Sequence, residues 1–356
     1  MKNKVLTIFF LIIVFGLGAV SICIKDILVS KFERRTLTQF PTELDEDFTK
    51  DLDDYLVDQF AYRNQFISLN SNLNRNMLNK IDDKDVYIID NNIYEINYPL
   101  NEKNTIDFTT KMNYITEKYF KEKNVYYSVI PDKSYFLDSN KYLKLDYTKM
   151  FDVLDSNMNG KYIDITDDLT IDDYYLTDIH WKQENIQDIA AKIMTRMGNT
   201  YIHENYEEKT YNNFYGASYS KGSSDLKTDT LKYLTNINLE QIKVAHLEHG
   251  MKNIYDEQKL YGVDSYDVFL SGPSSYLEIE NKETDKQNTL IVFRDSFASS
   301  IIPYFVPYYN KIIVIDLRYI DLSLIEDKIN YDNSDVLYLY STLIINSSSI
   351  LKVNIK

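Results

Sequence analysis

The chain has 356 residues, 44% of them hydrophobic and 26% charged, which is typical of a globular protein with one large or two modest domains. Its formal net charge of -15 argues against nucleic-acid binding, because a phosphate backbone requires a basic surface. The single cysteine, Cys23, excludes an internal disulfide and a cysteine-based metal site.

Residues 5–24 form an almost uninterrupted apolar run without a charged residue, preceded by Lys2 and Lys4. As a helix, about 20 such residues span a hydrocarbon core of about 30 Å. We therefore expect residues 1–30 to form a cytoplasmic tip and a single-pass anchor in the cell membrane, with the bulk of the chain extracytoplasmic. The alternative is secretion after signal cleavage, because Ala19-Val20-Ser21 resembles a small-residue cleavage site.

We expect residues 31–103 to form a helical and hairpin segment, called the lead-in below, that joins the anchor to the main domain. Apolar side chains recur near helical spacing over residues 45–80, which predicts a helix there. Residues 85–95 predict a β-hairpin, because two short apolar runs flank a turn at Asp90-Asn91-Asn92.

From residue 104 onwards, helical and strand patterns alternate, which favours a parallel sheet flanked by helices. We expect an α/β domain over residues 104–356, with an insertion of mixed structure at about residues 206–286. The predicted strands are residues 125–130, 290–293, 312–316 and 336–340. The predicted helices are residues 106–121, 184–197, 297–304 and 322–329.

Asp178 and His180 lie two positions apart in the stretch that contains the only tryptophan, Trp181. In an extended chain, such positions point to the same side. An imidazole between a carboxylate and a hydroxyl is the arrangement that activates a serine. The alternative is that Thr177 or Asp178 caps the following helix and His180 is a polar surface residue.

Ser296 follows a predicted strand and precedes a predicted helix. A serine at a tight strand-to-helix turn exposes its hydroxyl, and nearby N–H groups can stabilise an oxyanion. The alternative is that Asp295 and Ser296 only cap the following helix.

His246 and His249 offer two imidazoles but no obvious third ligand, so we expect no metal site. No cofactor is expected either. Arg294 and Arg318 are residues that can hold an anion or order a carboxylate.

Three motifs together resemble the DHHW proteins of bacteria, a family named for its Asp-His-His-Trp signature. They are Thr177-Asp178-Ile179-His180-Trp181, Arg294-Asp295-Ser296-Phe297 and Pro131-Asp132-Lys133. This family is similar to the SGNH-hydrolase-like domain of the alginate O-acetyltransferases AlgJ and AlgX. Arg34-Arg35-Thr36-Leu37 and Asp58-Gln59-Phe60 also resemble the lead-in that follows the anchor in this family.

The resemblance implies an SGNH-hydrolase-like fold in which Asp178 orients the imidazole, His180 is the base and Ser296 is the nucleophile. Further candidates for the substrate or oxyanion region are Pro131, Lys133, Trp181, Gly272 and Arg294. Two residues depart from the family patterns. Ile179 replaces the first histidine of the DHHW signature, and Arg294 stands where glycine precedes Asp-Ser in the SGNH signature.

The expected function is extracytoplasmic O-acetyl transfer to a cell-surface or secreted polysaccharide. A carbohydrate acetyl esterase with the same triad is one alternative, and a catalytically inactive interaction protein of the cell envelope is another. The family likeness also implies a multi-pass membrane protein as the partner that delivers the acyl group.

Overall fold

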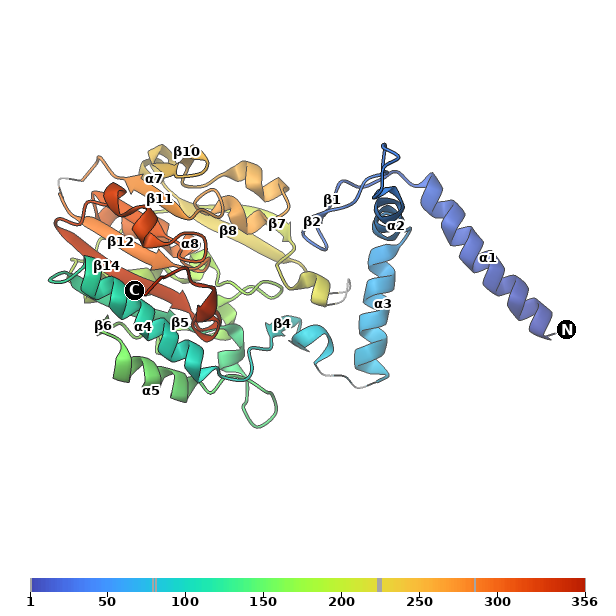
Figure 1. Cartoon of the computed structure of the whole chain (residues 1–356), viewed down its shortest axis with the longest axis horizontal. Helices are drawn as coiled ribbons and strands as arrows, with labels where there is room; N and C mark the ends of the chain where they lie inside the picture. Colours follow the sequence, from blue (N-terminus) through green and yellow to red (C-terminus); the bar gives the residue numbers. More distant parts are fainter. Residues whose placement is uncertain (1, 79, 81, 223–225, 285, 356) are drawn as a thin grey trace.

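The computed structural model describes residues 2–78, 80, 82–222, 226–284 and 286–355. Helix α1 (Lys2–Cys23) projects away from the rest of the molecule, and its side chains are largely exposed (Figure 1). Its segment Lys4–Cys23 is long and apolar enough to cross a membrane. This helix fits a signal anchor or a signal peptide, as predicted from the apolar run.

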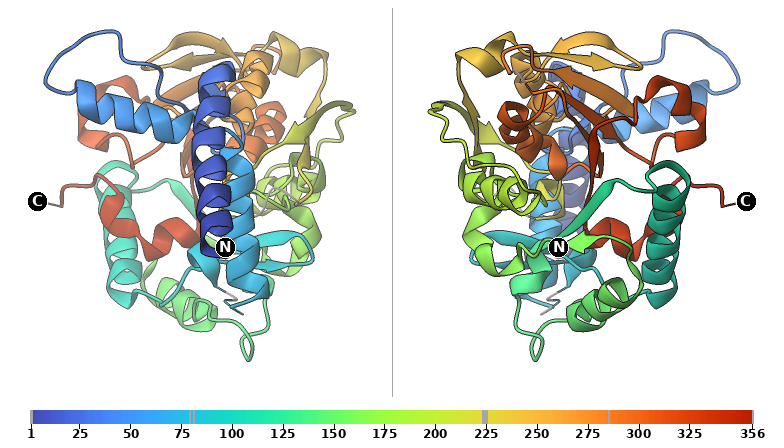
Figure 2. Two further views of the ribbon diagram at one scale, coloured as in Figure 1. Left: turned by 90° about the vertical axis from the view of Figure 1, so that its right-hand side faces the viewer. Right: turned by 90° about the vertical axis from the view of Figure 1, so that its left-hand side faces the viewer.

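The lead-in lies between α1 and the α/β domain (Figures 1 and 2). It begins with the short antiparallel pair β1 (Val29–Ser30) and β2 (Arg35–Thr36). The single helix predicted over residues 45–80 is wrong, because the chain forms α2 (Phe48–Asp58) and α3 (Arg63–Asn76). Tyr62 has a left-handed backbone conformation with φ 60°, which separates the two helices.

The predicted hairpin is confirmed as β3 (Val86–Ile89) paired with β4 (Asn92–Glu95). Asp90 and Asn91 form its two-residue turn with φ values of 50° and 66°. Aspartate and asparagine tolerate this conformation better than most residues, and it matches the twist of paired strands.

The α/β domain is built on a sheet of eight strands in the order β10-β9-β11-β13-β12-β14-β5-β6. Five of them run parallel and confirm the predicted fold class: β5 (Asn124–Ile130), β6 (Lys161–Tyr162), β12 (Thr289–Arg294), β13 (Lys311–Ile315) and β14 (Ser334–Ser341). The insertion adds three antiparallel strands at one side: β9 (Lys243–His246), β10 (Gly250–Asn253) and β11 (Tyr276–Glu280).

Helices cover both faces of this sheet, because successive strand side chains point to opposite faces. In β12, Leu290 and Val292 belong to one buried cluster, whereas Ile291 and Phe293 belong to the other. The first cluster includes α6 (Gln187–Arg196) and α8 (Ala298–Ile301). The second includes α4 (Glu102–Tyr119), α5 (Tyr147–Asn157) and α9 (Thr342–Asn346).

The rest of the insertion supplies the hairpin β7 (Glu207–Phe214) and β8 (Asp229–Thr235) and the short helix α7 (Ile237–Gln241). Their buried residues join the cluster that contains α6 and α8. The insertion therefore builds the face of the sheet on which the candidate site lies.

Two predicted helices differ from the structure. Residues 322–329 form two 3₁₀ turns, Leu322–Leu324 and Glu326–Lys328, since so short a segment cannot offset the cost of helix nucleation by itself. The helix predicted over residues 297–304 becomes a 3₁₀ segment, η9 (Ile302–Tyr308), after its first turn. Pro303 and Pro307 lie in that segment and have no N–H to donate to an α-helical bond.

Candidate active site

The structure brings Asp178, His180 and Ser296 into one hydrogen-bonded chain. His180 Nδ1 lies 2.5 Å from Asp178 Oδ1, and His180 Nε2 lies 2.8 Å from Ser296 Oγ. Asp178 is fully buried, His180 is 6% exposed, and Ser296 is half-buried. The carboxylate is thus shielded from water, while the hydroxyl remains open to a substrate.

A tight loop, rather than an extended strand, positions Asp178 and His180. The loop is closed by a bridge between Tyr174 and Trp181 and by the Tyr175 N–H, which donates to the His180 carbonyl at 3.1 Å. Inside it, Asp178 Oδ1 accepts the His180 N–H at 3.0 Å, which is an Asx turn. The expectation of an extended chain is therefore corrected, although the two side chains do meet.

The capping alternatives for this stretch do not match the structure. Helix α6 begins at Gln187, and Ile186 occupies its N-cap position, so neither Thr177 nor Asp178 caps it.

At the other stretch, Asp295 Oδ1 accepts the Phe297 N–H at 3.0 Å and forms the turn before α8. Asp295 Oδ2 accepts the Ser341 N–H at 2.7 Å, which ties this turn to the end of β14. The turn is thus held by Asp295, and the Ser296 hydroxyl is left to bond with His180.

The Asp178 carboxylate is held as an anion by groups from distant segments. Its Oδ2 accepts the Ala217 N–H at 2.6 Å, and Arg34 Nη1 lies 3.4 Å away. Burial alone would raise the pKa of the Asp178 carboxyl, but the charge and hydrogen bond of His180 and the charge of Arg34 hold that pKa well below its ordinary value. An ionised Asp178 fixes the His180 orientation in which Nδ1 donates and Nε2 accepts.

A second buried carboxylate, that of Asp229 on β8, holds the loop that carries Asp178 and His180 through hydrogen bonds. It accepts the N–H groups of Leu176 and Thr177 at 2.7 and 2.8 Å and the Thr177 hydroxyl at 2.5 Å. Gly216 packs directly on the same loop, and an added Cβ would lie 2.4 Å from the Asp178 nitrogen. Only glycine permits this close approach of the two backbones.

Lys133 and Pro131 also lie behind the loop. Lys133 is 3% exposed, and its Nζ donates to the carbonyls of Tyr175 and Leu176 at 2.7 and 2.8 Å. Burial lowers the pKa of Lys133 to about 7, although the charges of Asp229 and Asp178 oppose that shift. The buried Pro131 accepts the Tyr174 hydroxyl at 2.6 Å. Both residues hold the loop in place, and their place in the substrate or oxyanion region stays a prediction.

Trp181 is fully buried and joins the two halves of the site. Its Nε1 donates to the Phe297 carbonyl at 2.9 Å and lies 3.0 Å from Ser300 Oγ. Because its ring is covered and its N–H is paired, Trp181 aligns the histidine loop with the serine turn. Its place in the substrate or oxyanion region also stays a prediction.

Arg294 lies beneath the serine turn and is 2% exposed. Its Nη1 donates to the Asp295 carbonyl at 3.2 Å and to Ser299 Oγ at 3.1 Å, and it lies 3.9 Å from Asp316. Arg318 holds the same Asp316 carboxylate through two hydrogen bonds of 2.9 and 2.7 Å. Arg318 thus orders the Asp316 carboxylate, whereas Arg294 holds the backbone of the serine turn and does not displace the Ser296 hydroxyl from His180.

Gly272 lies in the buried turn after η8 (Ser265–Val268), the element that covers the histidine. Its φ of 94° favours glycine, and an added Cβ would lie 3.1 Å from the Asp267 carboxyl carbon. The Tyr266 ring of η8 stacks on the His180 imidazole with centroids 3.9 Å apart and an interplanar angle of 8°.

The sequence did not single out Arg34, Gly216, Asp229 or Tyr266 as parts of this site. Arg34 lies in a stretch that resembles the family and Tyr266 lies in the predicted insertion, but a role for either depends on which side chains it contacts in the folded protein. Asp229 and Gly216 lie in the insertion, where periodicity gives no indication of function.

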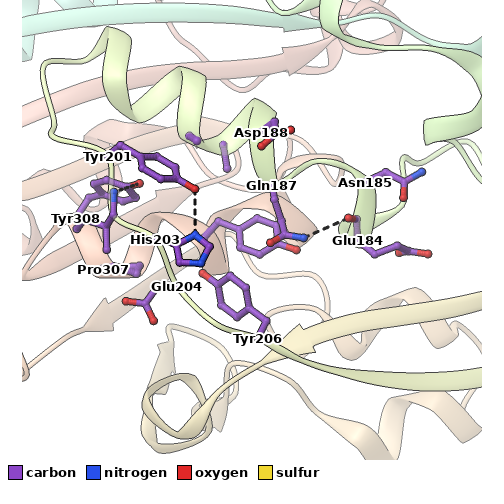
Figure 3. A pocket seen from close by; sticks show the side chains of 14 residues that line it. Glu184, Asn185, Gln187, Asp188, Tyr201, His203, Glu204, Tyr206, Pro307 and Tyr308 are labelled. Carbon is purple, nitrogen blue, oxygen red and sulfur yellow. Dashed lines mark hydrogen bonds between the residues drawn. The ribbon is translucent and has the colours of Figure 1, made fainter.

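A pocket of about 270 Å³ lies elsewhere, between α6 and η9, and contains none of the three triad residues (Figure 3). Tyr201 and His203 lie along it, with the hydroxyl 3.5 Å from the imidazole Nδ1. The other two histidines, His246 and His249, have ring centroids 5.8 Å apart. Among the described residues, no group of three or more His, Cys, Asp or Glu side chains is placed to hold a metal ion.

The parallel strands and the serine, histidine and aspartate at their carboxyl edge define a protein of SGNH-hydrolase-like fold. Residues 138–315 match the family described as DHHW protein, and the chain belongs to that family. This confirms the family resemblance deduced from the short motifs. No curated protein sequence matches the chain.

Two solved structures with TM-scores above 0.5 share this fold, and a third structure is a more distant match. A DHHW family protein from Eubacterium siraeum has 20% identity and a TM-score of 0.61, over 74% of this chain and 93% of that chain. Bacillus cereus PatB1 with a sulfonyl adduct has 17% identity and a TM-score of 0.58, over 73% and 97%. The O-acetyltransferase domain of Pseudomonas putida AlgJ has 9% identity and a TM-score of 0.40, over 69% and 84%.

Proposed function

We propose that this protein is a serine-dependent O-acetyltransferase that modifies hydroxyl groups of a cell-surface or secreted polysaccharide. One observation carries the proposal: Ser296, His180 and Asp178 form a continuous chain with separations of 2.8 and 2.5 Å. This is the geometry in which an imidazole withdraws the proton of a hydroxyl nucleophile.

In the first half-reaction, Ser296 Oγ attacks the carbonyl carbon of an acetyl ester or thioester, and its proton moves to His180 Nε2. Asp178 stabilises the imidazolium that forms. The tetrahedral intermediate collapses when the bond to the leaving group breaks, and the leaving group takes the proton from His180. The Ser296 N–H has no partner among the described residues and is available to donate to the oxyanion.

In the second half-reaction, a sugar hydroxyl gives its proton to His180 and attacks the acetyl carbonyl on Ser296. The new ester forms, the bond to Ser296 Oγ breaks, and His180 returns its proton to that oxygen. Water in place of the sugar would release acetate, which is the esterase alternative.

The apolar helix α1 supports placement of this reaction at the outer side of a cell membrane. A cytoplasmic donor of acetyl groups cannot reach such a site without a carrier. We therefore propose that a multi-pass membrane protein delivers the acyl group.

The inactive interaction protein is disfavoured by the position of Arg294. A bulky residue before Asp-Ser threatened the geometry of the nucleophile, but the Arg294 side chain is buried beneath the turn. Ser296 and His180 remain at hydrogen-bond distance.

The function is tested with the full chain in detergent and an activated acetyl ester. The wild type should release the leaving group and form an acetylated Ser296 that mass spectrometry of peptides detects. Ser296→Ala and His180→Ala should lose most of this activity, whereas Ser323→Ala, an exposed serine in another part of the domain, should retain it. Equal rates for the wild type and Ser296→Ala would rule out the enzyme.

Addition of an oligosaccharide separates the two enzymatic functions. A transferase adds the mass of an acetyl group to the sugar, and this gain disappears in Ser296→Ala. Release of acetate at the same rate with and without the acceptor would identify an esterase instead.

A further inference from the structure

Arg34 reaches the candidate active site from the short turn between β1 and β2, which follows the apolar helix closely in sequence. Its Nη1 lies 3.4 Å from Asp178 Oδ2, although the two residues are 144 positions apart. Its Nη2 forms an ion pair with Asp264. The guanidinium thus lies between two carboxylates. Only 15% of the Arg34 side chain is exposed, so it is largely shielded from water.

The turn that carries Arg34 is held in place by other residues. Phe32 is 7% exposed and packs edge-on against Tyr219, with ring centroids 5.5 Å apart. Arg35 donates to both oxygens of Asp58, at 2.8 and 2.5 Å. Because these contacts do not involve Arg34, a change of its side chain should leave the turn docked.

Asp264 connects Arg34 to the element that covers the histidine. Its Oδ1 accepts the Tyr266 N–H at 3.0 Å and caps η8. Tyr266 then stacks on the His180 ring at 3.9 Å. Arg34 therefore links the carboxylate that bonds to His180 Nδ1 to the tyrosine that covers one face of the imidazole ring.

We propose that Arg34 is a positioning residue of the active site: it bridges Asp178 and Asp264 and thereby keeps His180 aligned with Ser296. The segment that joins the apolar helix to the α/β domain is then part of the catalytic apparatus. This inference rests on the proposed serine chemistry, but it does not depend on whether α1 is retained or cleaved, since the predicted cleavage site precedes Arg34.

Arg34 also contributes charge to a crowded environment. Around the Asp178–His180 pair, the charge of Lys133 interacts with Asp178, and Asp267 interacts with both Arg34 and His180. Asp229 interacts with Lys133, and Asp264 pairs with Arg34. Arg294 and Asp295 act on Tyr266, which stacks on His180. Arg34 lowers the pKa of the Asp178 carboxyl, so its removal gives that carboxylate a greater affinity for a proton. On the acid side of the pH–rate profile, which we call the acid limb, the pH at which the rate falls should then be higher.

The test compares Arg34→Gln, Arg34→Lys and the wild type as full chains in detergent. Arg34→Gln keeps much of the side-chain length without the charge, whereas Arg34→Lys keeps the charge but cannot bridge two carboxylates as a planar fork. Lys31→Ala is the control, because Lys31 lies in the same turn and its exposed ammonium contacts the hydroxyl and ring of Tyr211, away from the Asp178 carboxylate. Thermal unfolding of each variant establishes that it folds.

Two rates are measured across pH: release of the leaving group from the acetyl ester, and covalent labelling of Ser296 by a sulfonyl fluoride. We expect Arg34→Gln to lower both by about 10–100-fold, because small displacements of catalytic groups have effects of this order. Its acid limb should move to higher pH. Arg34→Lys should restore the position of the limb and part of the rate, and Lys31→Ala should match the wild type.

The outcomes separate this inference from the proposed function. Arg34→Gln with wild-type labelling rates and an unchanged pH profile would overturn the role of Arg34 while leaving the triad intact. Labelling that depends on Arg34 in a protein that transfers no acyl group would support the inference and count against acyl transfer. A wild type that neither labels nor turns over would overturn both.

Discussion

His180 Nε2 lies 2.8 Å from Ser296 Oγ, although the two residues are 116 positions apart and belong to different segments of the α/β domain. The separation is short enough for direct proton transfer in the free protein. Because Trp181 and Phe297 join the same two segments through a further hydrogen bond, the alignment does not depend on a bound substrate.

Asp178→Asn should reduce the rate of Ser296 acetylation by roughly 10⁴-fold, since an amide favours the wrong tautomer of the histidine. The rate of leaving-group release from an activated ester measures the effect. Asp256→Asn, which changes a carboxylate on a different loop, is the control. A loss of less than tenfold would show that Asp178 is not the orienting carboxylate.

Gly216→Ala should destabilise the protein by about 3 kcal/mol and displace the loop that carries Asp178. The added Cβ would lie 2.4 Å from backbone atoms of Thr177 and Asp178, and neither backbone can move without breaking the hydrogen bonds of the loop. Urea unfolding measures the stability. Gly262→Ala, where the nearest atom is 3.3 Å away, should have a much smaller effect. Equal losses in the two variants would contradict the close packing.

Tyr266→Phe should retain most of the activity, and Tyr266→Ala should lose about tenfold or more. The phenylalanine keeps the ring that stacks on His180 at 3.9 Å and loses only the bond of the hydroxyl to Ser300. The alanine leaves the imidazole free to rotate away from Ser296. Steady-state rates and unfolding midpoints of both variants test this, and a greater loss in Tyr266→Phe would show that the hydroxyl matters more than the ring.

Asp58→Asn should weaken the folded state at neutral pH by about 1 kcal/mol, with a smaller effect in acid. The hydrogen bond from Arg35 outweighs burial and holds the pKa of Asp58 below the ordinary value of 3.8. The contribution of the ionised carboxyl is therefore complete above that value and is lost as the pH falls below it.

Urea unfolding of the wild type and Asp58→Asn between about pH 7 and about pH 2 measures this dependence. The two curves of stability against pH should converge at the acid end. A constant difference across the range would exclude the ionised Asp58–Arg35 pair as its source.

The local pattern was sufficient for several elements. The two apolar runs around Asp90 and Asn91 predicted the hairpin, and the buried runs predicted the parallel strands, because side-chain periodicity follows directly from backbone geometry. The pairing of Asp178 with His180 was also predicted, but for the wrong reason. An Asx turn, and not an extended chain, brings them together.

The local sequence pattern did not predict the conformation correctly where helical and non-helical backbone conformations differ little in free energy. Residues 322–329 have a helical pattern but form only 3₁₀ turns. The insertion contributes β9, β10 and β11 to the central sheet. Their sequences did not predict this, because strand pairing depends on partners that are distant along the chain.

The sequence by itself determined the family, the parallel core of the sheet and the three residues that meet at its carboxyl edge. The tertiary structure decided which groups surround them: Arg34 from the lead-in, Asp229 from β8 and Tyr266 from η8. Short motifs and periodicity report the conformation of neighbours along the chain. Ion pairs and ring contacts between distant segments depend on how those segments pack, and no local pattern encodes that packing.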